Sequence, residues 1–142
     1  MYCQIFPAGS LKTYQYVVVL SQYHGALLLS RHRKRTTWET QGGHIEAGET
    51  PPDAAKRELY EESGAMDYAI RVGFDYRAGD EGGSANGMVF LADIHTLGPI
   101  PDSEMAEVRT FDTLPSDDML TYPGITPVLY RYAKNMENRR EK

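Results

Sequence analysis

The sequence predicts an α/β fold in which a mixed β-sheet is packed between helices. Three features of the 142-residue chain lead to this expectation: several short segments have strand composition, one well-capped helix interrupts them, and an amphipathic helix follows the last of them. The length suits one domain over residues 1–142 that buries a core of its own.

Six segments are expected to be strands because β-branched and aromatic residues are frequent in them. Two of them flank a turn at 22–25 and form a hairpin; the six segments are 14–20, 26–31, 36–40, 69–76, 88–94 and 108–114. The glycine-rich segment 78–87 is expected to be a flexible loop. It serves either as an exposed hairpin connection or as a mobile flap over a substrate.

Two helices have clear boundary signals. Thr50 is a good N-cap, Pro51 suits the first turn and Gly64 is a natural stop, so the sequence predicts a helix over Pro51–Ser63. A second helix is expected to begin at Thr126, and its apolar stripe consists of Val128, Leu129, Tyr132 and Met136.

The composition limits the classes of partner. The chain has 20 acidic and 15 basic residues and a net charge of -5, which disfavours binding to extended nucleic acid. Phosphate substrates stay open because a bound cation can supply positive charge. The apolar runs are too short for a membrane span and the N-terminus lacks a secretory pattern, so we expect a cytoplasmic protein with no membrane partner.

Three glutamates crowd one side of the predicted central helix. At 3.6 residues per turn, Glu58, Glu61 and Glu62 fall within an arc of about 100 degrees. One interpretation is a divalent-cation site, for which oxygen ligands favour Mg2+ or Mn2+. The other is a solvated acidic face in which Arg57 pairs with Glu61.

The segment before the helix favours the metal site. It is a glycine-rich stretch from Gln41 to Glu49, and such a stretch brings backbone groups close to a ligand. Stretch and helix together resemble the Nudix box, G-x5-E-x7-R-E-U-x-E-E-x-G-U, in which U is aliphatic. The match runs from Gly43 to Ala65 and keeps every fixed position, with a small residue, Ala65, at the last aliphatic site.

The resemblance to Nudix hydrolases implies a Nudix-type α/β/α sandwich with a mixed central β-sheet. It also implies that water cleaves a diphosphate linked to another group, with Mg2+ as cofactor and Mn2+ as a substitute. Metal binding is then assigned to Glu58, Glu61, Glu62 and the carbonyl of Gly42. Beyond the box, Glu104 is either a further metal ligand or an exposed loop carboxylate.

The same resemblance assigns catalysis to Glu58, Arg57 and Glu61. Glu58 is expected to deprotonate or orient the attacking water, and Arg57 to fix the orientation. Glu49 is expected to hold the glycine-rich stretch against the helix rather than to act as the base.

Substrate binding is expected at Gly43 and at Arg31 or Arg33, unless the basic run 31–35 is only a solvated turn. The chain resembles small nucleoside-triphosphate pyrophosphohydrolases, so a (d)NTP is the leading substrate. The alternatives are ADP-ribose, nucleotide sugars, dinucleoside polyphosphates and capped RNA ends, or a non-catalytic nucleotide-sensing domain. Many members of the family form dimers, so a homodimer is a further expectation.

Overall fold

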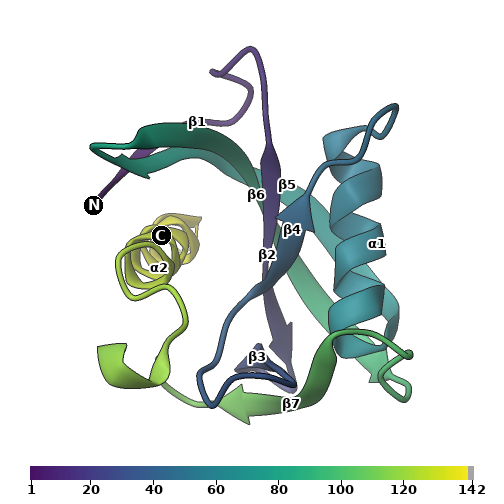
Figure 1. The fold of residues 1–142 in the computed structure, drawn as a ribbon. Coiled ribbons are helices and arrows are strands. Elements are labelled where there is room, and N and C mark those ends of the chain that lie inside the picture. The colour runs from purple at the N-terminus through teal and green to yellow at the C-terminus, as the bar shows by residue number, and fades with distance from the viewer. Residues whose placement is uncertain (141–142) are drawn as a thin grey trace.

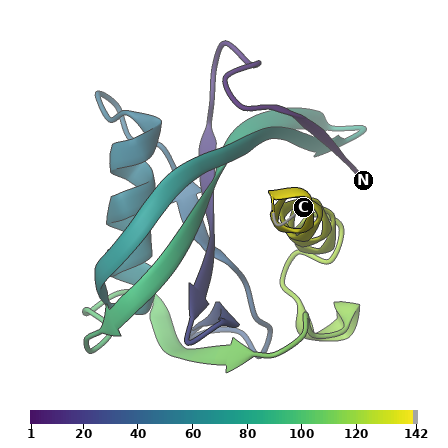
Figure 2. The ribbon, with the colours of Figure 1, turned by 180° about the vertical axis from the view of Figure 1, so that it is seen from behind.

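One seven-stranded β-sheet with a helix on each face organises the molecule (Figures 1 and 2), as seen in a computed structural model that describes residues 1–140. The strands are β1 (Tyr2–Pro7), β2 (Tyr16–Tyr23), β3 (Ala26–His32), β4 (Gln41–His44), β5 (Ala65–Asp80), β6 (Gly83–Leu97) and β7 (Met105–Phe111). The helices are α1 (Pro51–Ser63) and α2 (Thr126–Arg140), and a short 3-10 helix, η1, covers Asp117–Met119. This architecture confirms the predicted α/β/α sandwich.

The sheet is mixed, with strand order β1-β5-β6-β2-β3-β7 and β4 paired to β2 off this path. β2 and β6 run parallel, whereas the other pairs are antiparallel. β2 pairs with β4 over residues 16–19 and with β3 over residues 21–23. The first half of β2 therefore carries the glycine-rich segment alongside it, next to α1.

Alternating side chains of the central strands build two cores. Val17 and Val19 of β2 pack with Leu59 of α1, while Leu20 of β2 faces the other way and packs with Leu129 of α2. Fully burying a leucine such as Leu59 contributes roughly 1.5–3 kcal/mol to folding. The central strands are therefore buried on both faces, and the two helices lie on opposite sides of the sheet.

Both helices begin where the sequence predicts. α1 spans Pro51–Ser63 and α2 starts at Thr126. The described part of α2 reaches Arg140, and residues 141 and 142 of the expected domain lie outside the described residues. No helix within residues 1–140 has the length and apolar character required to cross a bilayer.

The expected strand at 36–40 is wrong. Residues in this segment form only isolated bridges, Ser30 with Glu39 and Trp38 with Leu120, and the strand is instead β4, at the start of the expected loop 41–49. β4 fits because Gly42 has φ of 151°, and a Cβ at this position would collide with the carbonyl of Val17. Two glycines thus allow the backbone to approach β2 closely, which overrides the turn preference of the segment.

The expected flexible loop at 78–87 is also wrong. β5 and β6 continue as a ladder up to the pair Asp80–Gly83, so only Glu81 and Gly82 form the turn. β1, which the sequence did not predict as a strand, pairs with β5 from Pro7–Phe74 to Tyr2–Gly79 and supports this extension. Tertiary pairing therefore orders a segment whose glycine content indicates flexibility, and the hairpin connection is the correct alternative. The last strand is shifted, to Met105–Phe111 in place of 108–114.

Candidate active site

Both ends of helix α1 are capped. The caps fix where the helix begins and ends, and so fix the positions of its acidic residues. The Thr50 hydroxyl accepts a hydrogen bond from the Asp53 N–H at 3.3 Å. At the other end, Gly64 adopts a left-handed φ of 81° and its N–H donates to the Tyr60 carbonyl. The face that packs on the sheet consists of the buried residues Ala54, Ala55, Leu59 and Ser63.

Two of the expected metal ligands meet the two glycines of β4. A Cβ on Gly43 would lie 2.7 Å from Oε1 of Glu58, so the absence of a side chain leaves room for this carboxylate. The N–H of Gly42 donates to Oε1 of Glu62 at 2.7 Å. The glycine pair therefore forms a cradle for both carboxylates, and the structure brings Gly42, Gly43, Glu58 and Glu62 together.

Arg57 is the hub of the ion pairs in this region. Its guanidinium donates to both oxygens of Glu49, at 2.7 and 3.0 Å, and to the carbonyl of His44 at 3.1 Å. It also donates to Glu58 at 2.8 Å and to Glu61 at 3.3 Å. The bond from Arg57 is the main cause that lowers the pKa of Glu49 to about 2. Glu49 and Arg57 thus join the segment before the helix to the helix itself, as expected.

The carboxyl groups beside the glycine pair are crowded and partly buried, which disfavours their charged forms. Burial is the main cause that raises the pKa of Glu62 to about 9, and the charges of Glu58, Glu39 and Glu104 raise it further against the opposing bond from Gly42. Burial also raises the pKa of Glu58. Since all these groups offer oxygen ligands, the set fits a hard divalent cation such as Mg2+ or Mn2+.

The carboxylates are not arranged as a finished metal site. Within residues 1–140, no three acidic, histidine or cysteine side chains converge into a metal-binding group. Glu58 and Glu61 turn toward Arg57, and Glu62 turns toward Gly42. The side chain of Glu104 is 81% exposed, and its Oε2 lies 3.5 Å from Nε2 of His32. The charge of Glu104 nevertheless raises the pKa of Glu62.

Arg31 and Arg33, the expected phosphate-binding residues, are engaged elsewhere. Arg31 bonds Glu107 at 2.8 Å and the carbonyl of Arg35 at 3.0 Å, and Arg33 donates to the carbonyl of Ser103. Among the hydrogen bonds and ion pairs of residues 1–140, neither guanidinium contacts a carboxylate of α1. Both side chains are therefore engaged by residues outside α1 and β4.

Glu39, which was not predicted from the sequence, is only 8% exposed. Its Oε1 accepts from Arg35 at 3.1 Å and from the Thr121 hydroxyl at 3.3 Å, and its charge acts on Glu62. A charged residue directly after Trp38 was the available signal, because buried carboxylates are rare unless they are paired.

A buried polar chain fixes the C-terminal end of α1. The Ser21 hydroxyl donates to the Gln41 carboxamide at 2.5 Å, Gln41 donates to the Ser30 hydroxyl at 2.9 Å, and Ser30 donates to the backbone carbonyl of Glu62 at 2.8 Å. This carbonyl is one of the last four of the helix, which have no partner within it. Three strands thus hold the turn that carries Glu62.

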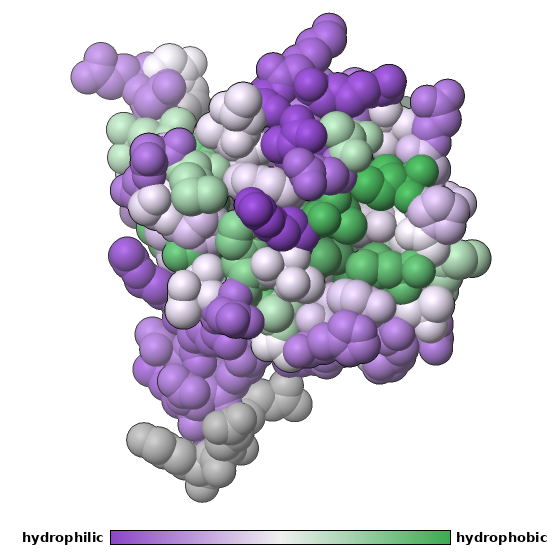
Figure 3. All heavy atoms as spheres, turned by 90° about the horizontal axis from the view of Figure 1, so that it is seen from below, coloured by the Kyte–Doolittle hydropathy of each residue, from purple (hydrophilic) through white to green (hydrophobic). Residues whose placement is uncertain are grey.

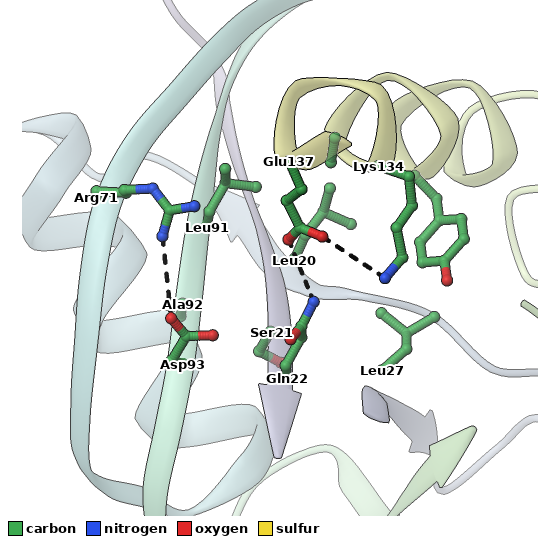
Figure 4. Close-up of a pocket in the computed structure, with 12 residues that line it drawn as sticks. Leu20, Ser21, Gln22, Leu27, Arg71, Leu91, Ala92, Asp93, Lys134 and Glu137 are labelled. Atoms are coloured by element: carbon green, nitrogen blue, oxygen red, sulfur yellow. Dashed lines mark hydrogen bonds and ion pairs between the residues drawn. The ribbon is translucent and has the colours of Figure 1, made fainter. Parts of the chain in front are cut away.

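A separate pocket lies between α2 and the opposite face of the sheet (Figure 4). Its polar side chains pair with one another: Arg71 with Asp93 at 4.0 Å, and Glu137 with both Gln22 and Lys134. Leu20 and Leu91 line the pocket as well. On the underside of the molecule, apolar side chains reach the surface and are bordered by polar ones (Figure 3). The pocket contains none of the α1 carboxylates.

Comparisons with known proteins agree with this geometry. The NUDIX domain family model matches residues 12–130. The RNA pyrophosphohydrolase of Photobacterium profundum is 36% identical over 55 residues, which cover 39% of this chain and 32% of that protein. That of Baumannia cicadellinicola subsp. Homalodisca coagulata is 34% identical over 55 residues, again 39% of this chain and 35% of that protein. The match thus spans about a third of each curated relative.

Solved structures share the fold. A mutant of the Bacillus subtilis pyrophosphohydrolase BsRppH superposes with a TM-score of 0.79 and 23% identity, over 96% of this chain and 90% of that one. A UDP-X diphosphatase superposes with a TM-score of 0.63 and 21% identity, over 84% of this chain and 61% of that one.

Proposed function

The chain belongs to the Nudix family, since the family model covers residues 12–130, and from this premise we propose that it is a metal-dependent pyrophosphohydrolase of nucleoside 5′-triphosphates. Water would attack a phosphoanhydride of a (d)NTP and release a nucleotide and a phosphate or diphosphate. The observation that carries the proposal is the cradle, in which Gly42 and Gly43 receive the carboxyl groups of Glu62 and Glu58, crowded together with the other carboxyl groups of the site.

We assign metal binding to Glu58, Glu61, Glu62, the carbonyl of Gly42 and Glu104. When bound there, Mg2+ would neutralise phosphate oxygens and polarise the phosphorus, and Mn2+ would substitute for it. Glu58 and Glu61 each accept from Arg57 through one carboxylate oxygen, which leaves the other oxygen for a metal ion. Arg57 also keeps its two bonds to Glu49, so the segment before the helix stays in place.

Catalysis is assigned to Glu58, Arg57 and Glu61. Glu58 would accept a proton from the water or orient it, and burial, which raises the pKa of this carboxyl, makes it a stronger base. Arg57 would fix the position of Glu58, to which it donates at 2.8 Å. Gly43 leaves the space in which the carboxylate moves.

Turnover by carboxylate variants tests the proposal. Glu58→Gln and Glu62→Gln should each lower Mg2+-dependent hydrolysis of dNTPs by at least about 100-fold while the fold is kept. Glu81→Gln, in the exposed β5–β6 turn, is the matched control. The panel contains NTPs, dNTPs, ADP-ribose, nucleotide sugars and dinucleoside polyphosphates, with products resolved. Wild-type activity in both site variants, or no turnover of any panel member, would refute the proposal.

A second candidate substrate is the 5′-triphosphate end of RNA. The relatives named as RNA pyrophosphohydrolases favour it, and the reacting group is the same triphosphate. A short RNA with a 5′-triphosphate, compared with the free NTP of the same base, distinguishes the two. A preference for the RNA would make the chain an RNA-end hydrolase, although its net charge of -5 favours contact with the terminus alone.

Two further properties belong to the same proposal. We expect the protein to act in the cytoplasm and to form a homodimer. Light scattering at several concentrations would detect the dimer.

A further inference from the structure

We propose that Arg35, held in place by Glu39, binds the phosphate groups of the substrate beside the α1 carboxylates. The inference rests on the proposed function, because it names the residue that receives the anionic part of the substrate at the same site. Nothing in the family resemblance assigns a role to this arginine.

Arg35 is the member of the basic run 31–35 that bonds Glu39, which is joined to the end of α1 through Ser30. Arg31 is held by Glu107, and Arg33 is held by the carbonyl of Ser103. Arg35 instead bonds Glu39, whose charge acts on Glu62. The side chain of Arg35 is 45% exposed, so its guanidinium is open to a ligand from solution.

Glu39 gives the guanidinium a defined position. Glu39 is anchored by backbone bonds with Ser30 in both directions, at 2.8 and 2.9 Å, and its carboxylate also accepts from Thr121. The Arg35 Nη1 to Glu39 Oε1 distance is 3.1 Å. Glu39 is the main cause that raises the pKa of Arg35. An arginine fixed on one side retains further N–H donors in a planar fork that matches phosphate.

The same Ser30 links this clamp to the metal-binding end of α1. Its backbone pairs with Glu39, while its hydroxyl donates to the Glu62 carbonyl at 2.8 Å. One residue of β3 thus separates the carboxylate that holds Arg35 from the turn that carries Glu62. These bonds fix Glu39, which holds Arg35, relative to the turn that carries Glu62.

The negative charge of the substrate and of the site explains why a fixed guanidinium such as that of Arg35 would be needed. A nucleoside triphosphate is strongly anionic, and it must approach Glu39, Glu58 and Glu62. Bound metal offsets part of this negative charge, and a fixed guanidinium offsets more. Charge-assisted hydrogen bonds of this kind contribute about 1.5–3 kcal/mol each, which corresponds to roughly 10- to 100-fold in affinity.

Binding of inorganic tripolyphosphate tests the inference without requiring turnover. Calorimetric titrations in the presence of Mg2+ compare wild type with Arg35→Ala, Arg35→Lys and Lys34→Ala. Lys34→Ala is the matched control because it removes one positive charge from the neighbouring exposed position. We expect about 10- to 100-fold weaker binding in Arg35→Ala, an intermediate loss in Arg35→Lys, and less than a twofold change in Lys34→Ala.

Glu39 is a positioning residue, so its variant is read differently. Glu39→Gln should raise KM for the nucleotide and weaken tripolyphosphate binding, while kcat changes less than KM. A thermal unfolding curve for each variant separates loss of fold from loss of binding. If Arg35→Ala does not fold, Arg35→Lys and Glu39→Gln decide the outcome.

The outcomes separate this inference from the proposed function. Equal binding by Arg35→Ala and Lys34→Ala would overturn the role of Arg35, even if the wild type hydrolyses dNTPs. A wild type that binds no tripolyphosphate would overturn it as well. Arg35-dependent binding without turnover of any panel substrate would support the inference and refute the proposed hydrolysis.

Discussion

The carboxylate of Glu58 occupies the space in which a side chain on Gly43 would lie, with 2.7 Å between a Cβ built there and Oε1. Two residues that are 15 positions apart in sequence are thus matched in shape, one by having no side chain. The relationship gives the first glycine of the box a physical role that does not depend on backbone flexibility.

Gly43→Ala should therefore damage the site more than the fold. The methyl group would push the Glu58 carboxylate away, so we expect at least a tenfold loss of Mn2+ affinity, measured by electron paramagnetic resonance, together with a loss of turnover. Unfolding in urea should change by only about 1 kcal/mol, because a partly exposed carboxylate can move.

Gly82→Ala is the control for this substitution, since a Cβ there would lie 3.2 Å from an Asp80 oxygen, in the exposed turn. It should retain Mn2+ affinity. Retained affinity in Gly43→Ala as well would show that Glu58 binds metal from another position or does not bind it.

The buried polar chain leads to a prediction about stability. Ser30→Ala would leave the Glu62 carbonyl without this donor and would remove one of the two acceptors of the Gln41 amide, which keeps the Leu28 carbonyl, next to side chains that are fully buried. We expect the free energy of unfolding to fall by about 1–3 kcal/mol in urea titrations. Ser84→Ala, in an exposed part of β6, should stay within about 0.5 kcal/mol of wild type. Equal stability of the two variants would mean that a water replaces the Ser30 hydroxyl.

The box was readable from sequence because its signals are local. The cap at Thr50, the stop at Gly64 and the spacing of Glu58, Glu61 and Glu62 all act within α1 or next to it, so the helix bounds matched the structure. The ladder of β5 and β6, in contrast, depends on β1, which is far away in sequence. No local composition reports such a partner.

The position of Arg35 escaped prediction for the same reason. Residues 31–35 form one basic run in sequence, and only the pairing of β3 with β7 and the burial of Glu39 distribute its members among different partners. Gln41 and Ser21 likewise become a network only when β4 lies on β2. The partners of these side chains therefore depend on the register between strands that are distant in sequence, which local composition does not report.

The pair Tyr14–Asp75 predicts a loss of stability at high pH. The Tyr14 hydroxyl donates to Oδ2 of Asp75 at 2.6 Å, and burial followed by this bond raises the pKa of Tyr14 to about 12 from 10.0. A pKa that is raised on folding gives stability that is fully present below pH 10 and is lost as the pH rises toward 12. Urea titrations at pH 8, 10 and 11.5 should show this decline.

Tyr14→Phe is the control for the pH series. It removes the titrating group, so its stability should fall less steeply than that of wild type over the same range. It should also be lower at pH 8, because Asp75 is fully buried and its Oδ1 already has no partner within the described residues. Parallel pH curves for the two proteins would assign the decline to other groups.

Metal binding should stabilise the folded protein through the α1 carboxylates. At a Mg2+ concentration of 100 times Kd, the ion would add about 2.7 kcal/mol to the free energy of unfolding, because it binds the native state. Thermal unfolding with increasing Mg2+ should therefore shift upward in wild type, and EDTA should reverse the shift. Glu62→Gln should reduce it strongly, since this variant loses a ligand at the cradle while it keeps an oxygen that can accept from Gly42.

The same substitution, Glu62→Gln, removes a buried carboxyl whose pKa is raised to about 9, so the variant without metal should be at least as stable as wild type at pH 7. A variant that is more stable without Mg2+ yet insensitive to it would identify Glu62 as a residue kept for metal binding rather than for folding.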